Sequence, residues 1–98
     1  MKRAFEKQSG TQTKEQKEVD VLENELHNLI VWNDDVNTFD WVIRSLMEIC
    51  EHTPEQAEQC ALIIHHNGKC IVQKGDFDSL LPKAEALLGR GIQATIDY

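Results

Sequence analysis

Residues 28–42 constrain the fold more than any other stretch of this chain. Four apolar residues at positions 29–32 include several β-forming side chains, and they run into the polar triplet Asn33, Asp34 and Asp35. An apolar pattern of helical period begins only at Phe39. The stretch therefore predicts a strand, a polar loop and a helix in immediate succession.

The polar loop has two interpretations. Asn33, Asp34 and Asp35 can be turn and cap residues, because short polar side chains bond their own backbone and tolerate unusual dihedral angles. They can also form a small acidic receptor, in which three acceptors at the end of a strand face a cation. The residue pattern alone is consistent with both.

Length and charge narrow the class of protein. A chain of 98 residues, 41% of them hydrophobic, suits one small domain with a single core. Seventeen acidic and ten basic residues give a net charge of −7, which argues against nucleic acid or an anionic membrane as the main partner. A cationic group is the favoured ligand, and nothing in the sequence indicates a cofactor.

No membrane or export signal is evident. The N-terminal charges are followed by no apolar run, and no window approaches the roughly 20 apolar residues of a membrane span. Cys50, Cys60 and Cys70 lie in apolar-periodic segments without a close pair, which predicts reduced core thiols in a cytoplasmic protein. The same spacing disfavours a metal site built from the thiols and histidines, namely Cys50, His52, Cys60, His65, His66 and Cys70.

The sequence divides into residues 1–24, a flexible N-terminal extension, and residues 25–98, the folded domain. The first 20 residues are almost all polar, so they cannot bury enough apolar surface to offset the entropy of ordering. Because their charges nearly cancel, the net acidity belongs to the folded part.

The first half of the domain predicts one strand and two helices. A strand over residues 25–32 places His27, Leu29 and Val31 on one face. Thr38 can cap the first helix, whose apolar side chains recur at i, i+3, i+4 and i+7: Phe39, Val42, Ile43, Leu46, Met47 and Cys50.

The second helix follows with almost no linker. Thr53 suits the N-cap, Pro54 the first helical position, and Gln56 stands three residues after the cap. Gly68 suits the left-handed position that closes a helix. The two helices must therefore turn sharply against each other.

The last third predicts a strand at 69–73 with an exit turn at 74–76, a third helix ending at 89–91, and a strand at 92–96. Pro82 leaves two alternatives: the helix begins at Pro82 after a loose turn from Asp76 or Asp78, or it is kinked there. The order β-α-α-β-α-β predicts an α+β fold, a small sandwich of a three-stranded sheet with three helices packed on one face.

Three features together resemble the ClpS family, the adaptors of the bacterial Clp protease. They are the triplet 33–35 before a helix, the segment 64–69 (Ile-His-His-Asn-Gly-Lys) at a helix-to-strand corner, and the order of elements over residues 26–97. The resemblance implies a non-catalytic adaptor that binds N-degrons, proteins whose first residue is Leu, Phe, Tyr or Trp. It also implies delivery to the N-terminal domain of an AAA+ unfoldase of the ClpA or ClpC type.

The resemblance also implies site residues. Asn33, Asp35 and His65 match the family's contacts to the substrate's α-amino group, and Asp34 matches a position that lines the same entrance and adds negative potential. The apolar pocket for the first side chain corresponds to Val31, Phe39, Val42, Ala61, Ile64 and Ile92. Asp78 and Lys83 fall where the family contacts the unfoldase. We expect a monomer.

Four positions depart from the family pattern. Phe39 stands where many relatives have Met, and Ala61 replaces a larger residue, often Met. Asn37 and Thr38 stand where a Thr followed by a Pro is usual. Because Phe is stiffer than Met and Ala is smaller, a different ranking of Leu, Phe, Tyr and Trp is a reasonable hypothesis.

Two other classes of function remain open at this stage. Asp34, Asp35 and His65 can be written as an acid-base set, but no nucleophile motif or phosphate loop accompanies them. His65 is also a common kind of residue at a helix end, where its cationic form suits the helix dipole. The remaining alternative is a generic small acidic protein-interaction domain that does not recognise an N-terminus.

Overall fold

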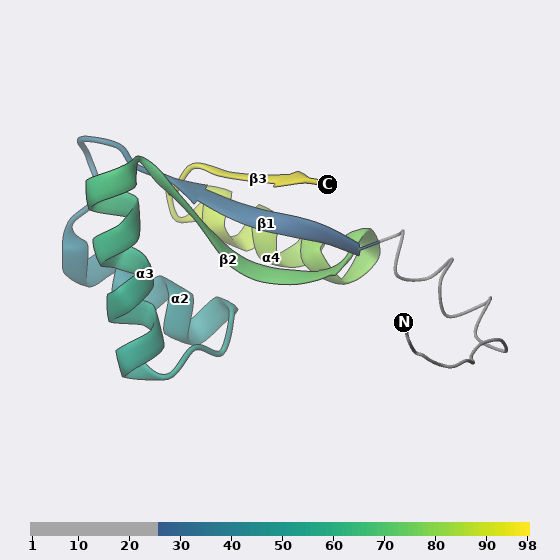
Figure 1. Ribbon diagram of the computed structural model, residues 1–98, viewed down its shortest axis with the longest axis horizontal. Coiled ribbons are helices and arrows are strands. Elements are labelled where there is room, and N and C mark those ends of the chain that lie inside the picture. Colours follow the sequence, from purple (N-terminus) through teal and green to yellow (C-terminus); the bar gives the residue numbers. More distant parts are fainter. Residues whose placement is uncertain (1–25) are drawn as a thin grey trace, which may run out of the picture.

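The computed structural model describes residues 26–98, so the predicted extension at 1–24 and the first residue of the predicted strand lie outside the described residues. Six elements follow one another along the chain (Figure 1): β1 Leu26–Trp32, α2 Phe39–Ile49, α3 Pro54–Asn67, β2 Lys69–Asp76, α4 Phe77–Gly89 and β3 Ala94–Asp97. The predicted α+β fold and its β-α-α-β-α-β order are confirmed.

The sheet has the strand order β2-β1-β3, and β1 pairs antiparallel with both neighbours. Alternation along β1 directs Leu29 and Val31 to the core, where both are fully buried, as the sequence predicts. Val72 of β2 and Ala94 of β3 join the same core. One face of the sheet therefore carries the hydrophobic core.

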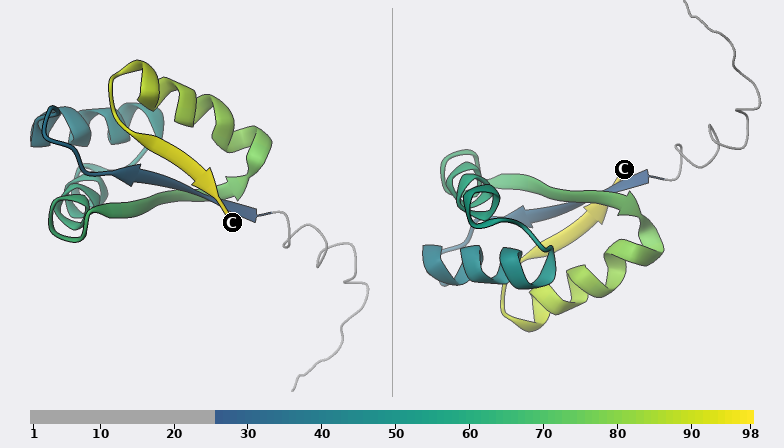
Figure 2. Two further views of the ribbon diagram at one scale, coloured as in Figure 1. Left: turned by 90° about the horizontal axis from the view of Figure 1, so that it is seen from above. Right: turned by 90° about the horizontal axis from the view of Figure 1, so that it is seen from below.

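The helices cover that core in different ways (Figure 2). α4 packs against all three strands, α3 packs against β2, and α2 packs against both other helices. Leu46 of α2 and Leu80 and Leu87 of α4 are fully buried. Burying a leucine side chain contributes about 1.5–3 kcal/mol, so these contacts account for much of the domain's stability.

Each helix begins at a side chain that accepts a hydrogen bond from the first turn. The Thr38 hydroxyl accepts from the Trp41 amide at 3.0 Å, and the Thr53 hydroxyl accepts from the Gln56 amide at 3.1 Å. The Asp76 carboxylate caps α4 at 2.7 Å from the Ser79 amide. Such caps are worth about 1 kcal/mol each. Two of the three caps are the threonines predicted from the sequence.

Two predicted strand boundaries are wrong, and the structure excludes one of the two alternatives for the start of the third helix. β2 continues to Asp76, because a register shift opposite Leu29 and Ile30 lets the strand resume its pairing with β1 beyond Gln73. α4 begins at Phe77, so Pro82 lies inside the helix and does not start it. β3 begins at Ala94, two residues later than the alternating pattern suggested.

The three cysteines are free thiols, with Cys50 buried and the other two half-buried. Burial raises the pKa of Cys50 to about 11 and that of Cys70 to about 12, so both thiols stay protonated at neutral pH. Within residues 26–98, no helix is long and apolar enough to span a membrane, and no group of three potential ligands is placed to hold a metal ion.

Candidate functional site

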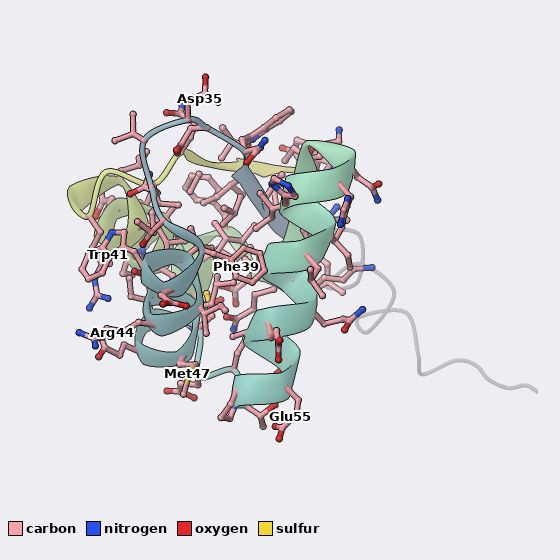
Figure 3. The ribbon with its side chains drawn as sticks, turned by 90° about the vertical axis from the view of Figure 1, so that its left-hand side faces the viewer. Asp35, Phe39, Trp41, Arg44, Met47 and Glu55 are labelled. Carbon is pink, nitrogen blue, oxygen red and sulfur yellow. The ribbon has the colours of Figure 1, made fainter. Side chains whose placement is uncertain are left out.

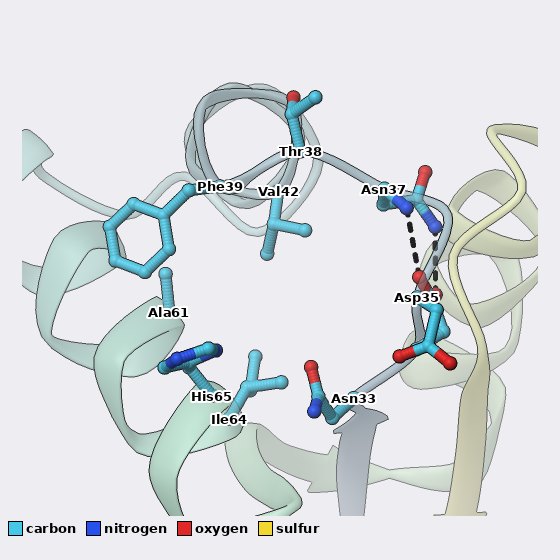
Figure 4. Close-up of a pocket in the computed structure, with 10 residues that line it drawn as sticks. Asn33, Asp35, Asn37, Thr38, Phe39, Val42, Ala61, Ile64 and His65 are labelled. Atoms are coloured by element: carbon cyan, nitrogen blue, oxygen red, sulfur yellow. Dashed lines mark hydrogen bonds between the residues drawn. The ribbon is translucent and has the colours of Figure 1, made fainter.

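A cavity of about 280 Å³ opens between the loop after β1, the start of α2 and the second half of α3 (Figure 4). Its lining combines a polar loop with an apolar pair of helices: Asn33, Asp34, Asp35, Asn37, Thr38, Phe39, Val42, Ala61, Ile64 and His65. Eight of these ten residues were predicted from the sequence as amine-binding or pocket residues, all except Asn37 and Thr38.

Backbone hydrogen bonds hold the loop beside α3. The Asn33 amide donates to the Gly68 carbonyl at 2.8 Å, which ties the end of β1 to the corner where α3 ends. Gly68 has φ +93°, a left-handed conformation that glycine adopts without strain and that ends α3 at this point. The predicted helix-ending glycine thus brings His65 and Asn33 to the same cavity.

Three polar side chains at the cavity have no hydrogen-bonding partner among the described residues: Asn33, Asp35 and His65. All three are exposed, and the His65 ring lies edge-on to the ring of His66, at 5.2 Å between centroids. A carboxylate, an amide oxygen and an imidazole nitrogen can all accept hydrogen bonds. The cavity therefore offers unused acceptors to a ligand.

Asp34 has a different environment from its neighbour Asp35. One of its carboxylate oxygens accepts from the amides of Val36 and Asn37, both at 2.9 Å, and the other accepts from the Asn37 side chain at 2.8 Å. The hydrogen bond from the Asn37 backbone, with those from its side chain and from Val36, lowers the pKa of Asp34 despite partial burial. Asp34 therefore organises the loop and remains ionised at neutral pH.

The apolar wall comes from two helices. Phe39 and Val42 belong to the start of α2, and Ala61 and Ile64 belong to α3, where both are buried. Phe39 is 40% exposed and stands at the mouth of the cavity. Figure 3 shows it between α2 and α3, and Figure 4 places its ring across the opening from Asp35. The apolar and acidic sides thus face each other.

Four predicted site residues do not line this cavity. Val31 and Ile92 are fully buried, pack within the core cluster and are not among the residues that line the cavity. Ile92 precedes β3, and its amide donates to the Leu87 carbonyl at 3.0 Å. Asp78 and Lys83 lie on α4, outside the cavity lining.

Asn37 and Thr38 line the cavity, although the sequence marked Asn37 only as a departure from a family pattern and Thr38 only as such a departure and as a helix cap. Their position between the polar triplet and the first helical residue could have indicated that they line the cavity. A loop that turns back over a helix must place its last residues near the same opening as its first. Thr38 serves as the cap of α2, whereas Asn37 makes contacts beyond the loop.

The arrangement suits a ligand that joins a hydrogen-bond donor to an apolar group. The acceptors lie on the loop side and at His65, and the apolar side chains lie beside them. An apolar cavity of about 150 Å³ already accommodates benzene, so the present volume has room for an aromatic or branched side chain and a polar head.

Comparison with known proteins gives a consistent picture. The family model described as ATP-dependent Clp protease adaptor protein ClpS matches residues 22–95. The ATP-dependent Clp protease adapter protein ClpS of Campylobacter jejuni strain RM1221 is 46% identical over 61 residues, which are 62% of this chain and 62% of the relative. The protein of the same name from Streptomyces avermitilis is 28% identical over 67 residues, 68% of this chain and 64% of the relative.

These matches span less than two thirds of the relatives' lengths. Among solved structures, Agrobacterium tumefaciens ClpS2 bound to L-phenylalaninamide has a TM-score of 0.69 at 22% identity. The alignment covers 74% of this chain and 95% of that one, so the two share the fold of the whole described domain.

Proposed function

The chain belongs to the family of Clp protease adaptor proteins, ClpS, and on this premise we propose that its cavity binds the first residue of a protein substrate. The loop acceptors and His65 take the free α-amino group, and the apolar wall takes the first side chain. The substrates are N-degrons that begin with Leu, Phe, Tyr or Trp. The protein changes none of their bonds.

The observation that carries this proposal is the set of unpaired acceptors at Asn33, Asp35 and His65 around one cavity. An α-amino group has a pKa near 8, so at neutral pH it is mostly an ammonium with three donors, where an internal peptide group has one. Each hydrogen bond to such a charged group contributes about 1.5–3 kcal/mol. A polypeptide's beginning can therefore be distinguished from its middle.

The apolar wall supports the second half of the proposal. Val42, Ala61 and Ile64 present carbon surface next to the acceptors. Filling such a hole with Leu or Phe is worth about 1.5–3 kcal/mol. L-phenylalaninamide, the molecule bound to Agrobacterium ClpS2, combines a free amine with an aromatic side chain, which is the chemistry proposed here.

Delivery is the second part of the proposal. The bound substrate passes to the N-terminal domain of an AAA+ unfoldase of the ClpA or ClpC type, in the cytoplasm, with the adaptor acting as a monomer. Asp78 and Lys83 are the proposed unfoldase contacts, and both stand on α4, apart from the cavity lining. A substrate in the cavity therefore leaves these two side chains available.

Fluorescence anisotropy of a labelled peptide that begins with Phe, beside its N-acetylated twin, tests the binding step. We expect tight binding of the free amine and none of the acetylated peptide, with both peptides recovered at unchanged mass. Equal binding of the two peptides would identify a generic interaction domain, and a changed mass would identify an enzyme.

A degradation assay with a Clp unfoldase and protease tests delivery. A protein lacking residues 1–20 should bind the Phe peptide as the full chain does but fail to accelerate breakdown of a Phe-starting substrate. Undiminished acceleration would show that the N-terminal residues take no part in transfer.

A further inference from the structure

The side-chain nitrogen of Asn37 donates two hydrogen bonds, one within its own loop and one to a distant part of the chain. Its side-chain amide donates to the Asp34 carboxylate at 2.8 Å and to the Gly91 carbonyl at 2.8 Å. A primary amide carries two N–H groups, so both donors of Asn37 are used. Figure 4 shows the bonds between Asn37 and the acidic loop at the edge of the cavity.

The acceptor Gly91 belongs to the turn that joins α4 to β3. This turn is itself fixed, since Gly91 has φ +82° and its amide donates to the Leu88 carbonyl at 3.0 Å. The preceding carbonyl, that of Arg90, accepts from the Trp41 indole at 3.1 Å. Two side chains from the loop and α2 therefore hold two successive carbonyls of one turn.

Hydrogen bonds therefore fix the loop both before and after Asp35. Before Asp35, the Asn33 amide donates to the Gly68 carbonyl. After it, the Asn37 side chain donates to the Asp34 carboxylate and to the Gly91 carbonyl. Asp35 lies between these anchors with its own carboxylate unpaired among the described residues. A loop held this way keeps an acceptor in place before any ligand arrives.

We propose that Asn37 is a positioning residue for the amine receptor, one that anchors the acidic loop to the α4–β3 turn and so holds the Asp35 carboxylate at the cavity. This proposal rests on the proposed function, because it assigns Asn37 a role in binding the substrate's amine. Asn37 acts through Asp34 and Asp35 and does not itself contact the ammonium.

The residue type matters for this role. A threonine hydroxyl has one hydrogen and can serve Asp34 or Gly91 but not both, and an aspartate has no donor at neutral pH. Alanine removes both bonds. Asn37→Thr therefore keeps one of the two hydrogen bonds, whereas Asn37→Ala and Asn37→Asp lose both, and all three substitutions change few atoms.

Peptide binding is the first measurement. Releasing one loop residue from a fixed conformation restores about 1–2 kcal/mol of conformational entropy, so Asn37→Ala should bind the Phe peptide about tenfold more weakly, through a faster dissociation rate. Asn37→Thr should fall between Asn37→Ala and the unaltered chain. Asn37→Asp should also bind more weakly, even though its added negative charge would favour a cation. Gln93→Ala, an exposed change two residues beyond Gly91, is the matched control.

The titration of Asp34, followed by carboxyl carbon NMR, is the second measurement and needs no peptide. Asn37 holds the pKa of Asp34 below its usual range through its backbone and side-chain hydrogen bonds. Asn37→Ala removes the side-chain hydrogen bond but keeps the backbone one, so the pKa of Asp34 should rise only part of the way towards its usual range, whereas in Gln93→Ala it should not change.

The two measurements together separate the outcomes. A raised Asp34 pKa with weakened binding supports the positioning role. Unchanged binding of Asn37→Ala would overturn that role and leave the proposed function standing. If the unaltered chain does not bind the free-amine peptide, both proposals fail, and an Asp34 pKa that is still below its usual range would show that the loop itself is intact.

Discussion

Different interactions order the two walls of the cavity, the loop wall formed by the polar loop after β1 and the helical wall formed by α2 and α3. The loop wall is exposed, and its order comes from hydrogen bonds such as those to Asp34. In the helical wall, which is the apolar wall described above, Ala61 and Ile64 are buried and packing holds them in place. Groups that bind a cation must keep their acceptors unpaired, which a loop at the surface allows. Groups that receive an apolar side chain are an extension of the core.

This difference predicts that the two walls can be damaged separately. A change in the loop wall should remove binding and leave the fold intact, because exposed side chains contribute little packing. A change in the helical wall should weaken the fold and the cavity together.

Ile64→Ala should have the largest effect. Ile64 is 4% exposed, and truncating such a side chain typically lowers the free energy of unfolding by 2–5 kcal/mol. Urea unfolding followed by tryptophan fluorescence measures the loss. Leu62→Ala, on the same helix but at 36% exposure, is the matched control and should lose much less. Equal losses would mean that the helical wall is not part of the core.

Asp35→Asn should act on the other wall. The change keeps the shape of the side chain but removes its charge, so affinity for the Phe peptide should fall by about 1.5–3 kcal/mol, or roughly 10- to 100-fold. The free energy of unfolding should change by less than about 0.5 kcal/mol, as for other exposed positions. Glu58→Gln alters the net charge equally on an exposed part of α3. A similar loss of affinity there would point to general electrostatics.

Sequence patterns predicted the helical wall because periodicity and caps are local signals. Thr38, Thr53 and Gly68 fix where helices begin or end, and all three do so in the structure. Boundaries set by other segments were not predictable in this way. β2 runs on because of its pairing with β1, and α4 contains Pro82 because Asp76, six residues before the proline, caps the helix.

The loop wall was predicted less completely. The triplet 33–35 indicated either turn residues or a receptor, and the structure gives the two acids separate environments: Asp34 is bonded within the loop, whereas Asp35 is unpaired among the described residues. The residue pattern alone could not separate them, since adjacent aspartates have the same local signal, and only the resemblance to a family gave them different roles. The structure places Ile92 in the core and outside the cavity lining, which an alternating pattern could not indicate, because such a pattern marks burial but not which cavity lies nearby.

Raising the pH should weaken binding through the ligand. With a pKa near 8, the protonated fraction of a peptide's amine falls about tenfold between pH 7 and pH 9, and affinity should fall with it. The pKa of Asp34 is lowered by its hydrogen bonds, so this carboxylate keeps its charge across the range. Anisotropy at several pH values measures the effect, and a flat profile up to pH 10 would exclude a cationic ligand.

Ala61→Met should have the smallest effect, a change in the order of affinities for peptides with different first residues. Ala61 lines the cavity with little exposure, and Phe39 stands at its mouth, so a longer side chain at position 61 narrows the space left for the substrate. Bulky Trp and Phe peptides should lose about 1 kcal/mol or more of affinity relative to the Leu peptide, since overpacking of that size costs about 1–3 kcal/mol.

Competition among four peptides that differ only in a first residue of Leu, Phe, Tyr or Trp measures this ranking. Ala86→Met makes the same change at an exposed position of α4 and should leave the order unaltered. If Ala61→Met also leaves the order unaltered, the helical wall does not select among side chains. Because the amine is the same in all four peptides, the discrimination would then have to come from side chains of the loop wall, which contradicts the roles assigned to the two walls.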